Sequence, residues 1–570
     1  MLFEFAFPMR RKTSSVSAFD RRSFLQLGGT AAALAGTGGL TSLLAACGAG
    51  GSTSSPSSSA VPSALAAKSI STIALPFLAD MGTVDPDIYY AGEGLQVTLS
   101  VYESLVTYAP VAADIPLTYQ PPSKRIAPGL AESWEVSPDG LTYTFHLRSG
   151  VKFHDGTPMD AAAWQNCFAR RAEVNGGPAY QVAPVASTEA PDPLTFVVKL
   201  KHPVDPFLDY MACPWSPKVI SPTALKKHQK KKDLAQGWLV GHEAGTGPYM
   251  LVDYVPNSYY TLEAFPGWWG PAPPVKRVNI PIIPDIQTQE LQFRAGQIDV
   301  MTKGLPIQDV VTFEQDPGYV VKFFALALSQ SMFLNPTKGR IFSNEALRLA
   351  LPSALNKQFL TTSVFKNTAT AATQFFPAGC FPSGLVPADS PYDPSKLSQI
   401  VSGLSSKDVD LAYGADGGAP NRVMAELVQA ELSAAGLNVT VRSIPTSLEY
   451  ALYDTPDAQR PDILLDSYGG DTIHVDTMLR IIFRTNAQPL NWFDYSYPQG
   501  DKLMDEAQRD PSAAQAQALY AQSADIYRDA GILVNIANGA DVIVSRAGIT
   551  NFVHDPMALE TVRLADLRRA

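Results

Sequence analysis

His154 and Asp155 are neighbouring residues whose side chains suggest acid–base chemistry, with the histidine as a general base and the aspartate orienting it. The two residues are adjacent in the chain, however, and no Gly-x-Ser-x-Gly nucleophile motif accompanies them. The run Asp155-Gly156-Thr157-Pro158 has instead the composition of a turn that leads into a helix, with Thr157 at the N-cap and Pro158 at the first helical position. We therefore expect no catalysis at His154, and a hydrolase is kept only as an alternative.

Residues suited to cofactor or metal chemistry are also missing from the sequence. The chain contains no P-loop, no His-Glu-x-x-His motif and no dinucleotide-binding glycine pattern. Its cysteines, Cys47, Cys167, Cys213 and Cys380, have no Cys-x-x-Cys spacing and no nearby histidine cluster, so we expect no zinc or iron–sulfur site. A disulfide among the last three stays open, with Cys167 to Cys213 closing the shortest loop.

The charge of the chain argues against nucleic acid and anionic lipid as partners. The formal net charge is −10, whereas both partners favour clustered Lys and Arg. One basic run extends from Lys226 to Lys232 and includes His228. Because no aromatic residue interleaves with these charges, we interpret the run as a solvated helix face rather than a site for a polyanion.

Residues 1–47 are typical of an export signal, because Arg and Lys residues precede a weakly apolar run from Phe24 to Ala46. Residues 20–25, DRRSFL, resemble a twin-arginine signal, which implies folding in the cytoplasm before export. Residues 44–48, LAACG, resemble a bacterial lipobox, which implies that Cys47 becomes the lipidated N-terminus. An uncleaved transmembrane anchor over Phe24 to Ala46 is the alternative.

A flexible tether is expected at residues 48–67, which are rich in Gly, Ser and Ala. Since no later stretch is both long and apolar enough to span a bilayer, we expect a globular body outside the cytoplasm. It would be periplasmic or held by its lipid on the outer face of the cytoplasmic membrane. A chain of 570 residues should form two or three lobes rather than a single core.

Two segments of this body can be interpreted from their residue patterns. Between residues 134 and 147, period-two apolar alternation on both sides of the turn Ser137-Pro138-Asp139-Gly140 predicts a β-hairpin with one apolar face. Residues 409–413 and 439–441 are typical of strands, and the segment between them has apolar residues at helical spacing until Gly436. The order strand, helix, strand predicts a parallel crossover.

Further sequence blocks follow in a definite order along the chain. They are Gly245-Thr246-Gly247-Pro248-Tyr249, Pro266-Gly267-Trp268-Trp269-Gly270, Arg294-Ala295-Gly296-Gln297-Ile298-Asp299, Phe333-Leu334-Asn335, Phe342-Ser343-Asn344-Glu345-Ala346-Leu347-Arg348, Pro391-Tyr392-Asp393-Pro394 and Asp501-Lys502-Leu503-Met504-Asp505-Glu506-Ala507. Together with residues 128–164, these blocks resemble the extracellular solute-binding proteins of family 5, the dipeptide, oligopeptide and nickel class that serves ABC importers. The resemblance covers the chain from about Ile70 onward.

The resemblance implies an α/β, two-lobed periplasmic-binding-protein-like fold with an extra inserted domain, in which helices flank mixed sheets and a hinge joins the lobes. The expected parts are lobe I at 68–100, 241–330 and 533–570, the inserted domain at 101–240, and lobe II at 331–532. Pro352 interrupts a helix that is continuous in the family pattern, which predicts a kink or an early end there.

The same resemblance implies a binding site in the cleft between the lobes. In the family, an aspartate at the position of Asp471 pairs with the free ammonium of a peptide, so the segment Tyr468-Gly469-Gly470-Asp471 is expected to bind ligand. Tyr468 stands where the family commonly has tryptophan, which leaves the pocket size open. Core packing would explain each aromatic candidate equally well. The other expected wall residues are Tyr89, Tyr90, Trp134, Phe333, Arg484, Asn491 and Trp492.

The implied function is that of a monomeric receptor without catalytic activity, cofactor or metal. It would capture dipeptides or oligopeptides by hinge closure, deliver them to an ABC permease and ATPase, and stay at the membrane through its lipid. The same fold binding a nickel chelate, an oligosaccharide or another amine-bearing metabolite is the main alternative, although the seven histidines are not clustered. A surface adhesin or sensor that keeps the receptor architecture is a third hypothesis.

Overall fold

The computed structural model describes residues 71–92, 94–112, 126–366, 368–377, 380–381, 384–415, 418–449, 451–487, 490–555 and 557–569. Residues 66–570 form one compact unit. The expected signal, the tether and the lipidation site Cys47 all lie outside the described residues.

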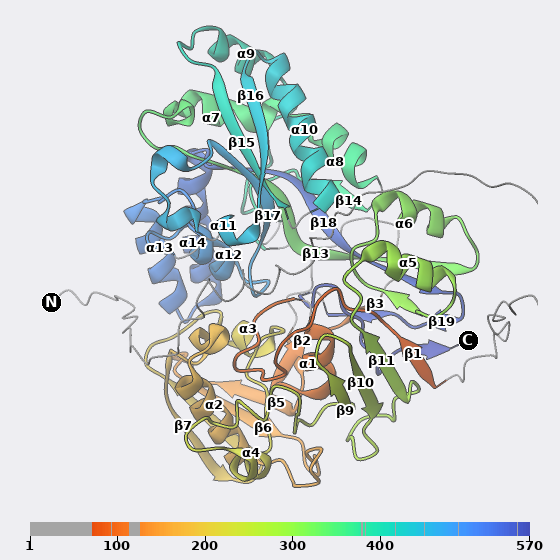
Figure 1. Cartoon of the computed structure of the whole chain (residues 1–570). Coiled ribbons are helices and arrows are strands. Elements are labelled where there is room, and N and C mark those ends of the chain that lie inside the picture. Colours follow the sequence, from red (N-terminus) through yellow and green to blue (C-terminus); the bar gives the residue numbers. More distant parts are fainter. Residues whose placement is uncertain are drawn as a thin grey trace, which may run out of the picture. The chain divides into compact units, whose positions relative to one another are not determined.

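A seven-stranded mixed sheet is the largest sheet among the described residues (Figure 1). Its main path runs β12-β18-β13-β17-β15-β16, and β14 pairs with β18 at the side of this path. The long antiparallel pair β13 and β18 changes register between Ala325 and Ser329 and again between Gln330 and Ser331. The strands are β12 (Val300–Met301), β13 (Tyr319–Leu334), β14 (Ala369–Ala371), β15 (Asp408–Gly414), β16 (Asn438–Ile444), β17 (Ile463–Gly469) and β18 (Leu533–Arg546).

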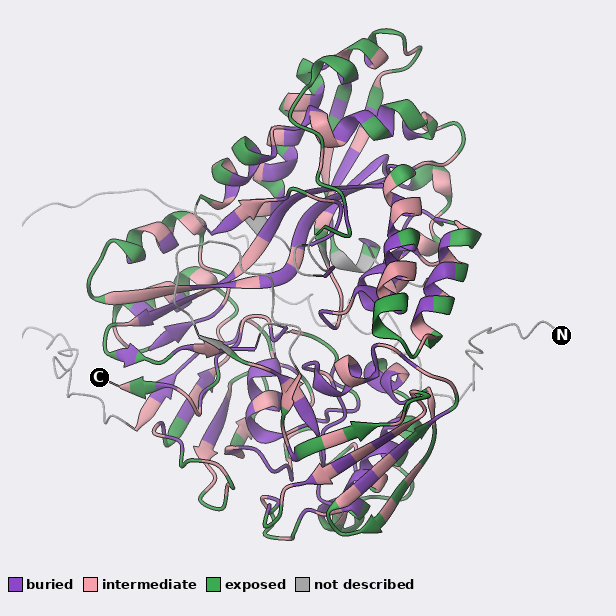
Figure 2. Cartoon of the chain, turned by 180° about the vertical axis from the view of Figure 1, so that it is seen from behind, coloured by how far each residue is buried: buried purple, intermediate pink, exposed green. Residues whose placement is uncertain are grey.

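Helices cover both faces of this sheet because its strands are apolar on both sides. On β17, Ile463 and Leu465 contribute to one hydrophobic cluster, whereas Leu464 contributes to another. This alternation follows from the period of two along a strand. Figure 2 shows the strands buried and the outward faces of the flanking helices exposed. The first cluster includes α7 (Glu345–Ala354), α8 (Lys357–Phe365), α9 (Ser395–Ser402) and α10 (Gly418–Ala434), and the second includes α12 (Val475–Phe483), α13 (Pro498–Arg509) and α14 (Ala513–Asp529).

Two four-stranded sheets lie in the parts of the chain that precede residue 282. One has the order β5-β6-β8-β7 and is antiparallel, and the other has the order β1-β11-β10-β9 with a parallel β1–β11 pair. Their strands are β1 (Thr72–Ala74), β5 (Ala131–Val136), β6 (Thr142–Leu147), β7 (Val185–Asp192), β8 (Thr195–Leu200), β9 (Tyr249–Val255), β10 (Tyr259–Ala264) and β11 (Arg277–Pro281).

Short strand pairs and further α-helices, together with short 3-10 helices such as Gly177–Gln181, connect these sheets. The two-stranded pairs are β2 (Val106–Tyr108) with β4 (Ile126–Pro128), β3 (Val111–Ala112) with β20 (Val553–His554), and β19 (Ile549–Thr550) with β21 (Arg568–Arg569). The remaining α-helices are α1 (Leu95–Val101), α2 (Ala161–Val174), α3 (Phe207–Ala212), α4 (Pro222–His228), α5 (Ile286–Arg294), α6 (Ile307–Glu314) and α11 (Thr446–Glu449).

The predicted hairpin is confirmed as β5 and β6, with Tyr143, Phe145 and Leu147 buried. The predicted start of the following helix is wrong. Asp160, not Thr157, caps α2 and accepts the backbone N–H of Ala163 at 2.8 Å. Thr157 is held in the preceding turn because its N–H and its hydroxyl both donate to Asp155.

The predicted strand–helix–strand unit is confirmed as β15, α10 and β16, and the two strands pair in parallel. Gly436 follows α10 with a φ of +99°, a value that favours glycine. Helix α7 ends at Ala354, two residues after Pro352, which confirms the expected early end.

Direct contacts join the stretch 101–240 to the stretch 331–532. The Asp205 carboxylate lies 2.9 Å from Nε2 of His474, and the Asp205 backbone N–H donates to the carbonyl of Gln508 at 2.8 Å. Asp205 follows β8, whereas His474 caps α12. These two parts of the chain therefore meet through hydrogen bonds as well as through their shared apolar cluster.

Cys167, Cys213 and Cys380 are buried, and none of them forms a disulfide in the described structure, so the Cys167–Cys213 disulfide that the sequence left open is absent. In the basic run, Lys226 and Lys227 are exposed on α4, while Lys230 to Lys232 are exposed beyond its end. None of the described helices combines the length and the apolar composition that crossing a membrane requires.

A buried lysine makes the stability of this fold depend on pH. The Nζ of Lys218 donates to Ser104 Oγ at 2.6 Å and to Ser216 Oγ at 3.0 Å, and burial lowers the pKa of Lys218 to about 8. The unfolded chain, with a lysine pKa of about 10.4, binds more protons than the folded chain between these values. The Lys218 contribution to stability therefore rises with pH across this window.

We expect Lys218→Met to change the free energy of unfolding by an amount that itself depends on pH. Relative to the wild type, the variant should lose roughly 3 kcal/mol of stability between pH 7 and pH 10.5, because only the wild type gains from deprotonation. Urea unfolding of both proteins across this range measures the difference, and a constant difference would contradict the assignment.

Candidate functional site

The carboxylate of Asp471 connects parts of the chain that are far apart in sequence. The hydroxyls of Tyr90 and Tyr180 both donate to its Oδ2, the second at 2.7 Å. Burial raises the pKa of Asp471, and the two tyrosine hydrogen bonds oppose part of this rise. Both hydroxyls bind the same oxygen, and no described residue donates a hydrogen bond to Oδ1, which can accept from a further donor.

Tyr90 is positioned by a buried ionic cluster. Arg170 Nη2 lies 2.6 Å from Asp85, and Arg171 Nε lies 2.8 Å from Asp87. Both arginines belong to α2, so this helix fixes the segment that ends at Tyr90. Such bidentate and multiple contacts suit the planar guanidinium group.

Asp471 follows the end of β17, where two glycines allow the chain to pass close to its neighbours. A Cβ atom on Gly470 would lie 2.7 Å from Thr477 Oγ1, and one on Gly469 would lie 2.8 Å from Leu328 Cδ1. A side chain at Gly470 would clash with the buried Thr477, and one at Gly469 would require the end of the Leu328 side chain to move. These two predicted residues therefore serve the site through their lack of a side chain.

A cavity of about 230 Å³ lies beside Asp471. Three of the described residues that line it carry carboxylates, Glu449, Asp466 and Asp471, and none carries a cationic side chain. The other lining residues are Trp215, Ala327, Leu328, Ser467, Gly469, Gly470, Ile482, Leu490, Trp492, Met557 and Leu559. The cavity is thus acidic on one part of its wall and apolar or aromatic on the rest.

Trp492 contributes a buried donor to this cavity. The residue is 2% exposed, and its indole N–H finds no acceptor in the described part of the chain. Its ring packs edge-on against Phe333, with the centroids 4.7 Å apart. Asn491 holds the loop in place, because its side-chain amide donates to the carbonyls of Arg484 and Tyr495.

Tyr89, Trp134 and Arg484 are not among the described residues that line this cavity. Tyr89 is buried, and its hydroxyl accepts the backbone N–H of Gly94. Trp134 packs on the core from β5, and Arg484 pairs with Asp505 at 3.0 Å. Tyr468 pairs through its backbone with Ser329 in the sheet, and its side chain is outside the described atoms.

Sequence reasoning missed Trp215, Glu449 and Asp466 as cavity residues. Asp466 had a local signal, since it is an acid within the otherwise apolar start of β17. Trp215 and Glu449 had none, because tertiary packing brings them here from positions more than 200 residues apart.

His154 is not arranged as a general base. Its Nδ1 lies 2.6 Å from the Glu243 carboxylate, and its Nε2 lies 2.9 Å from the carbonyl oxygen of Gly247. Although burial disfavours the charged ring, these partners hold the pKa of His154 above its usual value. Among the described residues, no group of three or more His, Cys, Asp or Glu side chains is placed to hold a metal ion.

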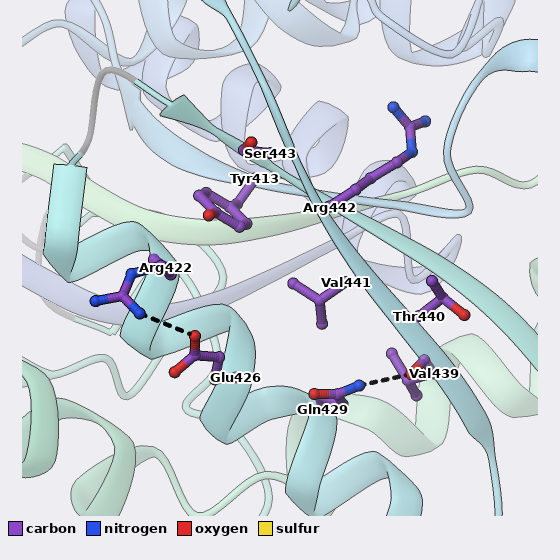
Figure 3. Close-up of a pocket in the computed structure, with 9 residues that line it drawn as sticks. All are labelled: Tyr413, Arg422, Glu426, Gln429, Val439, Thr440, Val441, Arg442 and Ser443. Carbon is purple, nitrogen blue, oxygen red and sulfur yellow. Dashed lines mark hydrogen bonds and ion pairs between the residues drawn. The ribbon is translucent and has the colours of Figure 1, made fainter. Parts of the chain in front are cut away.

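A second hollow, of about 500 Å³, lies between α10 and β16 (Figure 3). Arg422 pairs there with Glu426 at 3.3 Å, and Gln429 donates to the carbonyl of Val439 at 2.7 Å. Arg442 pairs with Asp410 at 3.0 Å. Since its polar groups bind one another, we take the cavity beside Asp471 as the candidate site.

This candidate site is suited to a cation that also has apolar parts. Carboxylates in a partly desolvated cavity favour a positively charged group, and the open Oδ1 of Asp471 can accept a hydrogen bond from it. The aromatic and aliphatic walls would cover the rest of such a molecule.

Two known proteins are similar in sequence to most of this chain. The chain is 27% identical over 507 residues to the nickel-binding periplasmic protein of Escherichia coli K12, covering 84% of this chain and 91% of the relative. It is 26% identical over 411 residues to the glutathione-binding protein GsiB of Escherichia coli O1:K1 / APEC, covering 70% and 77% of the two chains.

A solved structure shares the fold. The periplasmic binding protein DppA from Helicobacter pylori, in complex with the peptide STSA, superposes with a TM-score of 0.70. The superposition covers 87% of this chain and 98% of that chain at 22% identity. It confirms the predicted periplasmic-binding-protein-like fold.

A family model also matches residues 125–489, and its description is bacterial extracellular solute-binding proteins, family 5 Middle. This match covers more than half of the chain, from the strand before the β5–β6 hairpin to the loop before Trp492. The chain therefore belongs to the bacterial extracellular solute-binding proteins of family 5.

Proposed function

We propose that this solute-binding protein captures short peptides through their free amino terminus and delivers them to the permease and ATPase of an ABC importer. The observation that carries the proposal is the acidic cavity beside Asp471, whose described lining includes three carboxylates and no cationic side chain. A terminal ammonium is a compact cation with three donors, which suits such a site.

Asp471 would be the main partner of this ammonium. Tyr90 and Tyr180 orient its carboxylate and use only Oδ2, so the ammonium can bind at Oδ1 without breaking either contact. Burying this carboxylate is costly unless a cation approaches it, and a ligand without the amine would leave that cost in place. The site would therefore select for a free amino terminus.

The names of similar proteins support a peptide but include other solutes. The Helicobacter pylori structure holds a peptide, and one relative is described as a probable D,D-dipeptide-binding protein. Others are described as binding nickel or glutathione. Direct metal ligation is disfavoured here, because the described residues offer no suitable cluster.

Solute capture would proceed by closure of two lobes, with lobe I at 68–100, 241–330 and 533–570, the inserted domain at 101–240, and lobe II at 331–532. With these boundaries, the two chain crossings between lobes would fall on β13 and at the start of β18. The register shifts around Ser329 and Gln330 lie at the same place and would allow the strands to bend. Only a higher affinity for the closed state can drive this transition.

The N-terminal segment would determine the cellular location of the receptor. Residues 1–47 would direct export, and the lipobox-like residues 44–48 would leave Cys47 with a lipid on the outer face of the cytoplasmic membrane. Residues 48–67 would act as a tether, and the receptor would work as a monomer without catalysing a reaction.

Exchange of Asp471 for asparagine should lower the affinity for peptides with a free amino terminus by about a hundredfold, because the bound ammonium loses its counter-charge. N-acetylated forms of the same peptides should change far less. In the wild type, affinity for peptides with a free amino terminus should also fall at acidic pH, because Asp471, whose pKa is raised, becomes protonated. The affinity of the variant should not show this dependence on pH. Isothermal titration calorimetry of matched free and acetylated peptides measures all three effects.

Equal losses for free and acetylated peptides would remove the role assigned to Asp471. Native mass spectrometry of the purified protein, followed by denaturation and analysis of the released solute, tests the proposal independently. Recovery of a sugar or a metal complex in place of a peptide would overturn it.

Closure should be visible as a shorter distance between the inserted domain and lobe II when solute binds. Lys152 and Glu426 are exposed and suit paired spin labels after exchange to cysteine, with Cys47 replaced, because the three described native thiols are buried. Pulsed electron resonance should show a distance distribution that narrows and shortens with a binding peptide. Asp205→Asn, which removes the carboxylate that contacts His474, should broaden the distribution of the free protein.

Unchanged distances with every solute tested, including one that binds, would rule out hinge closure as the response to binding.

A further inference from the structure

Five lysines are clustered on α4 and the loop that follows it. Lys226 and Lys227 lie in the last turn of α4, and Lys230 to Lys232 come just after its end. All five are exposed, and none forms an ion pair with an acid among the described residues. The chain as a whole has a net charge of −10, so this cluster differs in sign from the rest of the protein. Unpaired like charges at such a density attract anions.

The loop holds these lysines in a fixed arrangement. The Asp233 carboxylate accepts the backbone N–H of Lys230 at 2.8 Å and that of Ala235 at 3.0 Å. The carbonyl oxygen of Leu234 accepts two hydrogen bonds from Arg170, which belongs to the buried ionic cluster on α2. The loop is therefore tied to α2, and its charges keep their positions relative to α4.

An aromatic residue lies against this cluster in the folded chain. The rings of His228 and His242 both stack on the indole of Trp238, with centroids 4.3 Å and 5.3 Å away from it. Partial burial and then the nearby charge of Lys227 lower the pKa of His228, so this lysine lies close to the stack. The interpretation of the basic run as a plain solvated face rested on the lack of an interleaved aromatic residue, and folding brings one in from outside the run.

A hollow of about 370 Å³ lies beside the stack. Lys227 and Trp238 line it together with Thr223, whose hydroxyl can donate a hydrogen bond. Val252 adds an exposed apolar side chain to the same lining. The hollow thus combines a cation, a hydroxyl, an aromatic ring and an apolar group.

Two acids also line this hollow, but both are engaged within the chain. Glu243 is paired with His154 at 2.6 Å. Asp155 accepts hydrogen bonds from the hydroxyls of Thr157 and Ser221. The charged group of the described lining that has no ionic partner is Lys227.

A membrane surface suits this combination better than a nucleic acid does. Proteins bind single-stranded nucleic acids with aromatic rings that stack on the bases, whereas the Trp238 ring is already stacked on two histidines of the chain. Anionic phospholipids attract clustered lysines, and tryptophan is enriched where a protein meets the membrane–water interface. The exposed side chains of Val240 and Val252 supply apolar contacts at this surface.

We propose that α4, residues 229–235 and Trp238 form a surface that binds the anionic phospholipids of the membrane in which the permease lies. The five lysines pair with the charged headgroups, while Trp238 and Val252 contact the interfacial region. This surface orients the receptor and adds a second contact to the lipid proposed at Cys47, since a lipid and a polybasic patch together hold a protein more firmly than either alone. The assignment rests on the proposed location at the membrane and does not depend on the identity of the solute.

The test is flotation with phospholipid vesicles, using the full chain with Cys47→Ser so that no lipid is attached. Vesicles of phosphatidylcholine alone are compared with vesicles in which one third of the lipid is phosphatidylglycerol. The protein should bind the anionic vesicles more tightly, and added salt should weaken this binding because it screens exposed charges. Exchange of all five lysines for glutamine should lower the affinity for the anionic vesicles tenfold or more.

The matched control exchanges five other exposed lysines for glutamine and so changes the net charge by the same amount. It should bind the anionic vesicles within threefold of the unexchanged protein. Thermal unfolding verifies that both variants are folded, and a variant with only Lys230 to Lys232 exchanged replaces the first if it is not. The control lysines are Lys201, Lys276, Lys338, Lys396 and Lys502.

Equal affinity of the unexchanged protein for both kinds of vesicle would overturn the proposal, as would an equal loss of affinity in the two variants. Lysine-dependent binding of a soluble polyanion such as heparin, without binding to anionic vesicles, would overturn the assignment to a membrane. Peptide affinity should be the same in both variants, so a failure of lipid binding leaves the solute-binding function intact.

Discussion

The half-buried carboxylate of Asp471 is the group on which the geometry of the site depends. It takes hydrogen bonds from Tyr90, close to the start of the described chain, and from Tyr180, nearly 300 residues before it in sequence. A carboxylate that leaves water loses hydration and must regain it from donors of the protein or of a ligand. The two tyrosine hydroxyls replace part of this hydration. Because both donate to Oδ2, a third donor can approach the carboxylate from the side of Oδ1.

Rigid elements on each side hold Tyr90 and Asp471 in their relative positions. The ionic cluster of Arg170 and Arg171 with Asp85 and Asp87 anchors the tyrosine segment to α2. On the opposite side, Asp471 continues directly from β17, which is buried in the middle of the seven-stranded sheet. A binding group built on such supports keeps its orientation, which reduces the entropy lost when a solute binds.

Local patterns in the sequence were sufficient to predict several elements. The β5–β6 hairpin and the β15–α10–β16 unit follow from alternation, helical spacing and turn residues, all of which act over a few positions. The helix cap at Thr157 was mispredicted because Asp155 binds the threonine within the turn, and Pro158 then pairs with Lys152 in a β-bridge. A choice between two nearby caps depends on such side-chain contacts, which spacing alone does not encode.

The site was harder to predict than the fold. Asp471 and its glycines were predicted through the family resemblance. Tyr90 contacts Asp471 and Trp492 lines the adjacent cavity, while their role in binding stays a prediction. Trp215, Glu449 and Met557 reach the cavity only through tertiary packing, so no local pattern marks them. Tyr89 and Trp134 were predicted to line the site but pack in the hydrophobic clusters. The sequence could not separate these two cases, because an aromatic residue near a cleft and one in a core have the same local pattern.

The buried cysteines have a consequence for the chemical reactivity of the folded protein. Cys167, Cys213 and Cys380 are enclosed by the folded chain without forming a cross-link, and burial raises the pKa of the Cys213 thiol to about 12, which suppresses its reactive thiolate form. An oxidant in the surrounding solution therefore meets little thiolate at Cys213 as long as the chain stays folded.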